Sequence, residues 1–190
     1  MERRSFLKKA GAGLAVGAAT TMPAIAADAP TIKWRLASSF PKSLDTIYGA
    51  AEVVSRRVAE ATNGKFQIQV FAGGEIVPAF GVLDAVKDGT VEMGHTASYY
   101  FVGKDPTFAF DCAIPFGMSN RQLDAWYRYG NGLKLMREFF GKYNIHNIPC
   151  GNTGVQMGGW FRKEIKTAAD LQGLKMRSCG FPGQVSPKPG

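Results

Sequence analysis

Three strand-like segments alternate with two helix-like segments between residues 32 and 96. The strand-like segments, in which apolar and polar residues alternate, are 32–37, 66–71 and 91–96. Residues 44–62 carry apolar side chains at helical spacing, with Ser43 as the expected cap, and a second helix is expected over residues 78–87. This β-α-β-α-β order is typical of an α/β fold with a parallel sheet and right-handed crossovers.

The pattern becomes less regular after residue 96. Residues 99–117 are rich in aromatic side chains, and Ser119 is placed to cap a long helical stretch that a Gly-Asn-Gly triplet at residues 130–132 interrupts. Further strands are expected at residues 145–150, 155–162 and 174–176. The Gly-rich segment 151–154 is either a crossing between two domains or an ordinary loop inside one.

The amino terminus carries an export signal. Arg3 and Arg4 are followed by Phe-Leu-Lys, a weakly apolar run over residues 10–22, and an Ala-Ile-Ala site. This order is typical of a twin-arginine (Tat) signal peptide, and we expect cleavage between Ala26 and Ala27. The alternative is a membrane-anchoring helix, but the apolar run is well short of the roughly 20 residues that span a bilayer. The prediction is therefore a periplasmic protein.

Composition and motifs exclude several classes of function. The chain has 23 basic and 15 acidic residues, but the basic residues after the signal are scattered, so no nucleic-acid partner is expected. Cys112, Cys150 and Cys179 lack metal-ligand spacing and are interpreted as small buried apolar residues. His95 and His146 are isolated and receive no catalytic role. No catalytic or cofactor motif occurs, so we expect no enzyme, no catalytic residue and no organic cofactor. The competing classes are an exported enzyme or redox protein and an interaction protein without a ligand.

Polar residues at the expected strand ends are the candidate ligand contacts, because small ligands usually bind there in α/β sheets. The candidates are Ser38, Ser39, Tyr99, Tyr100, Asn152, Gln156 and Arg177. Arg177 ends a short apolar run, and its guanidinium group matches a carboxylate through two parallel hydrogen bonds. The alternative is a surface arginine on an edge strand.

Four segments in order resemble one family of transport proteins. They are "ATNGKFQIQVFAGGEI", "DAVKDGTVEMGHTASYY", "FAFDCAIPFGMSNRQLDAW" and "DLQGLKMR". Over residues 32–177 the chain resembles the solute-binding subunits of tripartite ATP-independent periplasmic (TRAP) transporters, the DctP-like family. The segment "GNTGVQMGGWF" is similar to the subgroup that captures 2-oxo monocarboxylates such as pyruvate.

The resemblance implies a periplasmic-binding-protein-like fold of two α/β lobes that close like a clamshell. In this chain residues 1–26 would be the Tat signal peptide, 27–152 the first lobe and 153–190 the incomplete start of the second. The implied partners are a small organic acid and the small and large integral membrane subunits of the transporter. A complete chain would be a possible homodimer.

The resemblance also implies roles for individual residues. Arg177 would pair with the substrate carboxylate, and Gln156 would contact both the ligand and a cation beside it, Na⁺ or Ca²⁺. Asn152, Tyr99 and Tyr100 would be secondary ligand contacts. The ligand could instead be another organic acid, such as a dicarboxylate or a sugar acid.

The resemblance stops after Arg177. Pro187 and Pro189 stand where the family continues into a helix, which proline would break. The family leads us to expect roughly 100 or more further residues, beyond the usual size of one lobe. The expectation from the sequence is a truncated or frame-shifted product, with a non-functional chain as the alternative to a solute-binding protein.

Overall fold

The structure is a computed structural model that describes residues 30–154 and 159–175. The chain divides into a leading unit, Met1–Thr31, and a second unit, Ile32–Gly190. The predicted signal peptide therefore lies outside the described residues. All elements below belong to the second unit.

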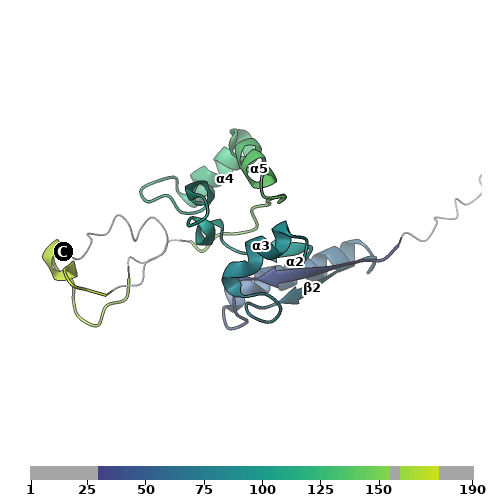
Figure 1. The fold of residues 1–190 in the computed structure, drawn as a ribbon, viewed down its shortest axis with the longest axis horizontal. Coiled ribbons are helices and arrows are strands. Elements are labelled where there is room, and N and C mark those ends of the chain that lie inside the picture. Colours follow the sequence, from purple (N-terminus) through teal and green to yellow (C-terminus); the bar gives the residue numbers. More distant parts are fainter. Residues whose placement is uncertain (1–29, 155–158, 176–190) are drawn as a thin grey trace, which may run out of the picture. The chain divides into compact units, whose positions relative to one another are not determined.

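A three-stranded parallel sheet forms the first part of this unit (Figure 1). The strand order is β2-β1-β3, with β1 (Ile32–Ser38) in the centre, β2 (Phe66–Phe71) on one side and β3 (Met93–His95) on the other. Ile32 pairs with Phe66, whereas only the last three residues of β1, from Leu36 onward, pair with β3. The predicted parallel α/β sheet is confirmed, and its third strand is shorter than expected because pairing is limited to this one end of β1.

Both faces of the sheet are covered by helices. Leu36 and Ala37 follow each other in β1 and so point to opposite faces. Leu36 packs with residues of α2 (Asp45–Ala61), whereas Ala37 packs with Val82 of α3 (Val82–Lys87), which η1 (Ala79–Gly81) precedes. The two helices thus bury the end of β1 from both sides (Figure 1). The carboxyl end of β1 is therefore its buried part.

The expected cap of α2 is wrong. Leu44, not Ser43, occupies the capping position and makes no side-chain cap hydrogen bond, although the Asp45 carboxylate accepts the Thr46 amide at 2.8 Å inside the first turn. The carboxyl end is better held, because the Thr62 hydroxyl accepts the Phe66 amide at 3.0 Å and donates to the Val58 carbonyl at 2.8 Å. The burial of the apolar side of α2 against the sheet supplies the stability that a cap would otherwise add.

The long helical stretch predicted after Ser119 forms two helices, α4 (Asn120–Tyr129) and α5 (Gly132–Gly141). They follow two short 3-10 helices, η2 (Ser98–Phe101) and η3 (Pro106–Ala109). The predicted Ser119 cap is confirmed: the Ser119 amide donates to Gln122 at 2.8 Å, and the Gln122 amide donates back to the Ser119 hydroxyl. The predicted interruption is confirmed too. A Cβ on Gly132 would lie 2.5 Å from the Trp126 ring, so only glycine allows this close approach.

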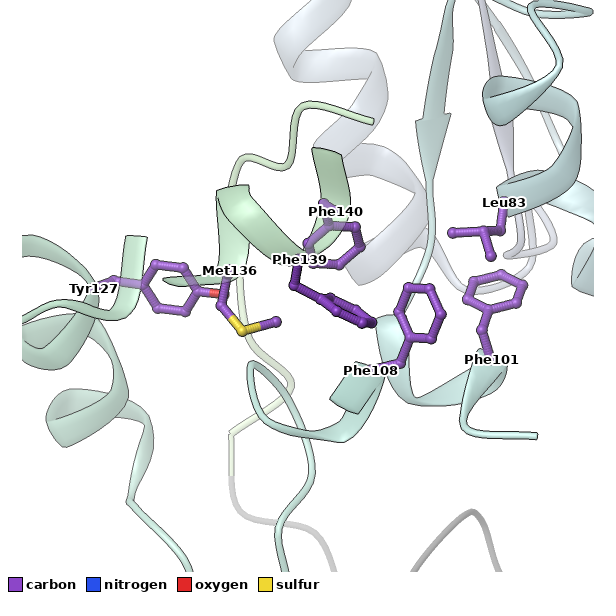
Figure 2. Packing of buried hydrophobic residues seen from close by; sticks show 7 residues of the cluster. All are labelled: Leu83, Phe101, Phe108, Tyr127, Met136, Phe139 and Phe140. Carbon is purple, nitrogen blue, oxygen red and sulfur yellow. The ribbon is translucent and has the colours of Figure 1, made fainter. Parts of the chain in front are cut away.

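An aromatic cluster joins these turns and helices (Figure 2). Phe108 is completely buried, and its ring contacts those of Phe101, Phe139 and Phe140 at centroid distances of 6.0, 4.8 and 5.5 Å. Leu83 of α3 belongs to the same cluster. The cluster therefore ties the segment after β3 to a helix of the sheet.

Several expectations for residues 142–175 are wrong. Residues 145–150 are not a strand, because none of the three described strands pairs with them to satisfy their backbone groups. Residues 159–162 and 174–175 are not strands either, and the rest of those two predicted strands lies outside the described residues. The last described element is η4 (Ala168–Leu171).

Two further findings concern single residues and membrane spans. Cys112 and Cys150 are exposed free thiols, not buried apolar residues, because they lie in irregular segments outside the three apolar clusters. Cys179 lies outside the described residues. Within residues 30–154 and 159–175, no helix has the length and apolar character needed to cross a bilayer.

Candidate functional site

Polar side chains gather where β1 and β3 end side by side. The Ser39 amide donates to the His95 carbonyl at 2.8 Å, which continues the ladder one residue past β1. The Ser39 hydroxyl lies 2.6 Å from both the Ala79 carbonyl and the Thr96 hydroxyl. Because a hydroxyl has one proton, Ser39 donates to the carbonyl and accepts from Thr96. This arrangement ties both strand ends to the start of η1.

The preceding residue, Ser38, is the last residue of β1 and makes a second set of contacts at the same edge. Its side chain is 1% exposed, and its hydroxyl accepts the Phe40 amide at 3.1 Å. The same oxygen lies 3.1 Å from Nδ1 of His95. Burial lowers the pKa of His95, so the imidazole is neutral at neutral pH. Ser38 thus connects the turn after β1 to the end of β3.

Aromatic rings line this edge and form what we call the aromatic wall: Phe40, Phe80, Tyr99 and Tyr100. Tyr100 is its centre, with ring centroids 6.2 Å from Phe40, 5.3 Å from Phe80 and 4.8 Å from Tyr99. Phe40 also packs edge-to-face against His95 at 5.1 Å. Three separate segments of the chain therefore contribute to one surface.

The backbones of the loops after β1 and β2 approach each other closely next to Phe40. Gly73, just after β2, donates its amide to the Phe40 carbonyl at 3.0 Å. A Cβ at this position would lie 2.9 Å from the Ser39 carbonyl oxygen, so glycine is required for the approach. Lys42 and Glu75 form an ion pair of 2.7 Å between the same two loops. The loops after β1 and β2 are thereby held together beside the site.

The described side chains that meet at this edge are either uncharged or paired with an opposite charge. The described groups that meet here are hydroxyls, a neutral imidazole and aromatic rings, and the nearby lysine is paired with a carboxylate. An anionic ligand would need its positive partner from another segment. In the described part of the chain, no cluster of three or more His, Cys, Asp or Glu side chains is arranged to hold a metal ion.

The structure brings together part of the predicted site. Tyr99 and Tyr100 lie in the aromatic wall, beside the strand ends that carry Ser38 and Ser39. The two serine hydroxyls are buried and engaged by protein groups, so they support the site but do not face a ligand.

The remaining predicted residues are not joined to this edge by the described contacts. Asn152 is exposed, and its side-chain oxygen accepts the Gly154 amide at 3.0 Å in a local turn. Arg177 and Gln156 lie outside the described residues. Their roles stay predictions.

Three members of the site were missed from the sequence. Phe40 falls in the irregular turn after β1, Phe80 lies at the start of the helix predicted over residues 78–87 and was not singled out, and His95 was set aside as isolated. The signal that could have found His95 is its place at the carboxyl end of a predicted strand, next to the equivalent end of β1.

A second polar cluster includes Ser98, which directly precedes Tyr99 in η2. The Ser98 hydroxyl donates to the Asp111 carboxylate, and burial raises the pKa of Asp111. Burial next to Asp111 also raises the pKa of Tyr127, whose hydroxyl oxygen has no hydrogen-bond partner within 3.5 Å among the described atoms. The Ser98–Asp111 bond thus ties η2 to the segment after η3.

Comparison with protein-family models identifies the family of this chain. The family model described as bacterial extracellular solute-binding protein, family 7 (DctP) matches residues 37–186. The chain belongs to this family. The match spans β1 from Ala37 onward, both sheet helices and the aromatic cluster, and it includes the segments that carry Asn152, Gln156 and Arg177.

Individual DctP-family proteins are similar over most of this chain. The monocarboxylate 2-oxoacid-binding periplasmic protein of Nostoc sp. is 49% identical over 97% of the chain and 52% of its own length. A TRAP transporter solute-binding protein from Bordetella bronchiseptica, with copurified calcium and picolinate in its active site, superposes with a TM-score of 0.79 at 53% identity, over 82% of this chain and 46% of that one. A TRAP periplasmic solute-binding protein from Pseudoalteromonas atlantica, with bound sodium and pyruvate, gives 0.76 at 45% identity, over 82% and 47%.

These comparisons confirm the predicted family and the α/β fold of periplasmic solute-binding proteins. They also show that the chain spans about half the length of the relatives it matches. The matched relatives are solute-binding transport proteins by description, not enzymes.

Proposed function

We propose that this DctP-family chain is the periplasmic solute-binding subunit of a TRAP transporter and captures a 2-oxo monocarboxylic acid such as pyruvate. The observation that carries the proposal is the 49% identity, over 97% of the chain, to a relative named for binding monocarboxylate 2-oxoacids. The aromatic wall at the carboxyl ends of parallel strands adds support, because small ligands bind at such edges in α/β folds.

Arg177 is proposed as the partner of the substrate carboxylate. The described groups at the strand ends are neutral, so an acid captured there needs a cationic partner from another segment. A planar guanidinium group offers two parallel hydrogen bonds to a carboxylate. Gln156 is proposed to contact the ligand and to give its side-chain oxygen to a Na⁺ or Ca²⁺ ion, as hard cations prefer oxygen ligands. Tyr99, Tyr100 and Asn152 are the proposed secondary contacts.

The energetics assign Arg177 a role in orientation and selection. A charge-assisted, bidentate contact contributes about 1.5–3 kcal/mol net. Capture at micromolar affinity requires about 8 kcal/mol. The rings of the aromatic wall, the cation and further contacts must therefore supply the larger part of the binding free energy.

Export and delivery are part of the proposal. The twin-arginine segment at residues 3–4 would direct the chain through the Tat route, with cleavage between Ala26 and Ala27 and delivery of the ligand to the integral membrane subunits. Amino-terminal sequencing of the protein recovered from the periplasm tests this step. A first residue other than Ala27 would move the cleavage site.

Calorimetric titration of the chain with pyruvate in the presence of Na⁺ or Ca²⁺ tests the binding function. We expect heat of binding from the unaltered chain, none detectable from Arg177→Ala, and weakened binding from Arg177→Lys, since an ammonium group cannot reproduce the two parallel bonds. Arg137→Ala is the matched control, because it removes an equal charge from an exposed position of α5. Unchanged affinity in Arg177→Ala, or no binding by the unaltered chain, contradicts the proposal.

A further inference from the structure

We propose that His95 is a positioning residue of the ligand edge: as the neutral tautomer with its proton on Nε2, it accepts the Ser38 hydroxyl and thereby fixes the turn that carries Phe40. Phe40 is one end of the aromatic wall. The consequence for ligand capture rests on the proposed function, whereas the tautomer and its structural effect do not.

The hydrogen bonds at Ser38 select the tautomer. The Ser38 oxygen accepts the Phe40 amide proton at 3.1 Å, and its own proton needs an acceptor because the side chain is 1% exposed. Nδ1 of His95, at 3.1 Å, is the acceptor that the structure offers. An Nδ1 that accepts carries no proton, so a neutral imidazole must hold its proton on Nε2.

The surroundings of His95 favour this neutral form. Ser38 from β1 and Phe40 from the following turn contact the ring, and Tyr100 of η2 lies behind Phe40. Burial alone lowers the pKa of His95, with no contribution from a charged side chain of the described residues. Glu92, the charged residue just before β3, is paired with Arg35 at 2.7 Å.

Protonation of His95 would disturb the edge in two ways. The imidazolium would place a charge among buried groups, and it would present an N–H instead of a lone pair to Ser38. The hydroxyl proton of Ser38 would then lose its acceptor, which costs the hydrogen bond and the desolvation of a buried donor. We therefore expect the turn at Phe40 to loosen when His95 becomes charged.

The sign of the pH effect follows from the lowered pKa. The folded chain binds the proton on His95 less readily than the unfolded chain, in which histidine titrates near about pH 6.5. The stabilisation is therefore complete above that pH and is lost as the pH falls toward the pKa of His95 in the folded chain.

Nitrogen NMR of the histidine rings tests the tautomer without any ligand. The chain has two histidines, so the control variant His146→Asn leaves only the signals of His95. We expect an unprotonated Nδ1, a protonated Nε2, and a titration midpoint below about pH 6.5. A proton on Nδ1 at neutral pH, or a midpoint above that value, would overturn the inference.

Two variants separate positioning from simple packing. His95→Asn keeps an acceptor near the place of Nδ1 but cannot titrate, whereas His95→Phe keeps a ring against Phe40 but leaves the Ser38 proton without an acceptor. We expect His95→Asn to remove the contribution of this histidine to the pH dependence of unfolding below about pH 6.5 and to retain the stability of the parent at neutral pH. His95→Phe should lose stability at every pH. Equal stability of the two variants would contradict the positioning role.

Pyruvate titration then links the two proposals. His95→Phe should weaken pyruvate binding by about tenfold, the equivalent of one lost hydrogen bond, and His95→Asn should bind as the parent does. Equal binding by all three chains overturns the effect on capture. If the unaltered chain binds no pyruvate, the proposed function fails, while the NMR result still decides the tautomer.

Discussion

Replacing Phe108 with alanine should remove a large share of the stability of this chain. The Phe108 side chain is 0% exposed, and four rings surround it: those of Phe101, Phe139, Phe140 and Tyr143. The centroids of Phe139 and Tyr143 lie 4.8 and 5.0 Å away, at edge-to-face or tilted angles (Figure 2 shows Phe108 with Phe139). These are the favourable geometries for aromatic pairs.

The magnitude follows from burial and from the shape of the cluster. A buried Phe→Ala substitution costs about 3–5 kcal/mol, because transfer free energy is lost and a cavity remains. We expect the upper half of that range, since rigid rings on several sides collapse poorly into a cavity. Whole domains are stabilised by about 5–15 kcal/mol. The variant should therefore lose between about a quarter and all of the stability of a typical domain.

Urea unfolding followed by far-ultraviolet circular dichroism measures the effect. The midpoint should fall sharply while the dependence on urea stays that of the parent. Phe116→Ala is the matched control, because Phe116 is fully exposed and its truncation should change stability by less than about 0.5 kcal/mol. A loss below about 1 kcal/mol in Phe108→Ala would show that the cluster does not support the fold, and the reasoning would be refuted.

Three other substitutions test particular contacts. The ion pair with Arg35 lowers the pKa of Glu92 to about 2, so stability should be complete above the ordinary value of 4.5 and fall as the pH drops from there toward 2; Glu92→Gln should flatten that part of a pH series of thermal unfolding. Gly94→Ala should destabilise the sheet by about 1–3 kcal/mol in urea unfolding, because the added Cβ would lie 2.8 Å from Val82. In contrast, Gly49→Ala should stabilise by about 0.5–1 kcal/mol in the same assay, since it lies inside α2 with nothing within 4 Å; a loss there would show that helix propensity is overridden.

Local patterns determined much of the fold. The alternation over residues 32–37 and 66–71 predicted β1 and β2 closely, and Ser119 and the triplet at 130–132 marked where α4 begins and where it is separated from α5. These features depend on residues a few positions apart, so periodicity and capping chemistry suffice to find them. The family likeness, too, was a property of short segments in order.

Whether other segments form strands depends on neighbouring strands that lie far away in the sequence, which local patterns do not reveal. Residues 145–150 alternate like a strand, but none of the described strands pairs with them, and so they stay irregular. The third predicted strand shrank to Met93–His95 because only the last three residues of β1 reach it. A strand exists only with its neighbour, and that neighbour is chosen by the order of the sheet.

The sequence by itself determined the class of fold and the family. The tertiary structure decided which side chains meet at the strand ends. Phe40, Phe80 and His95 are up to 55 positions apart in the chain, and they meet because β3 pairs with β1 instead of β2. Periodicity reports which face of an element is apolar, but the neighbours of a side chain depend on how distant elements pack, because burial stabilises the assembled sheet and not its separate parts.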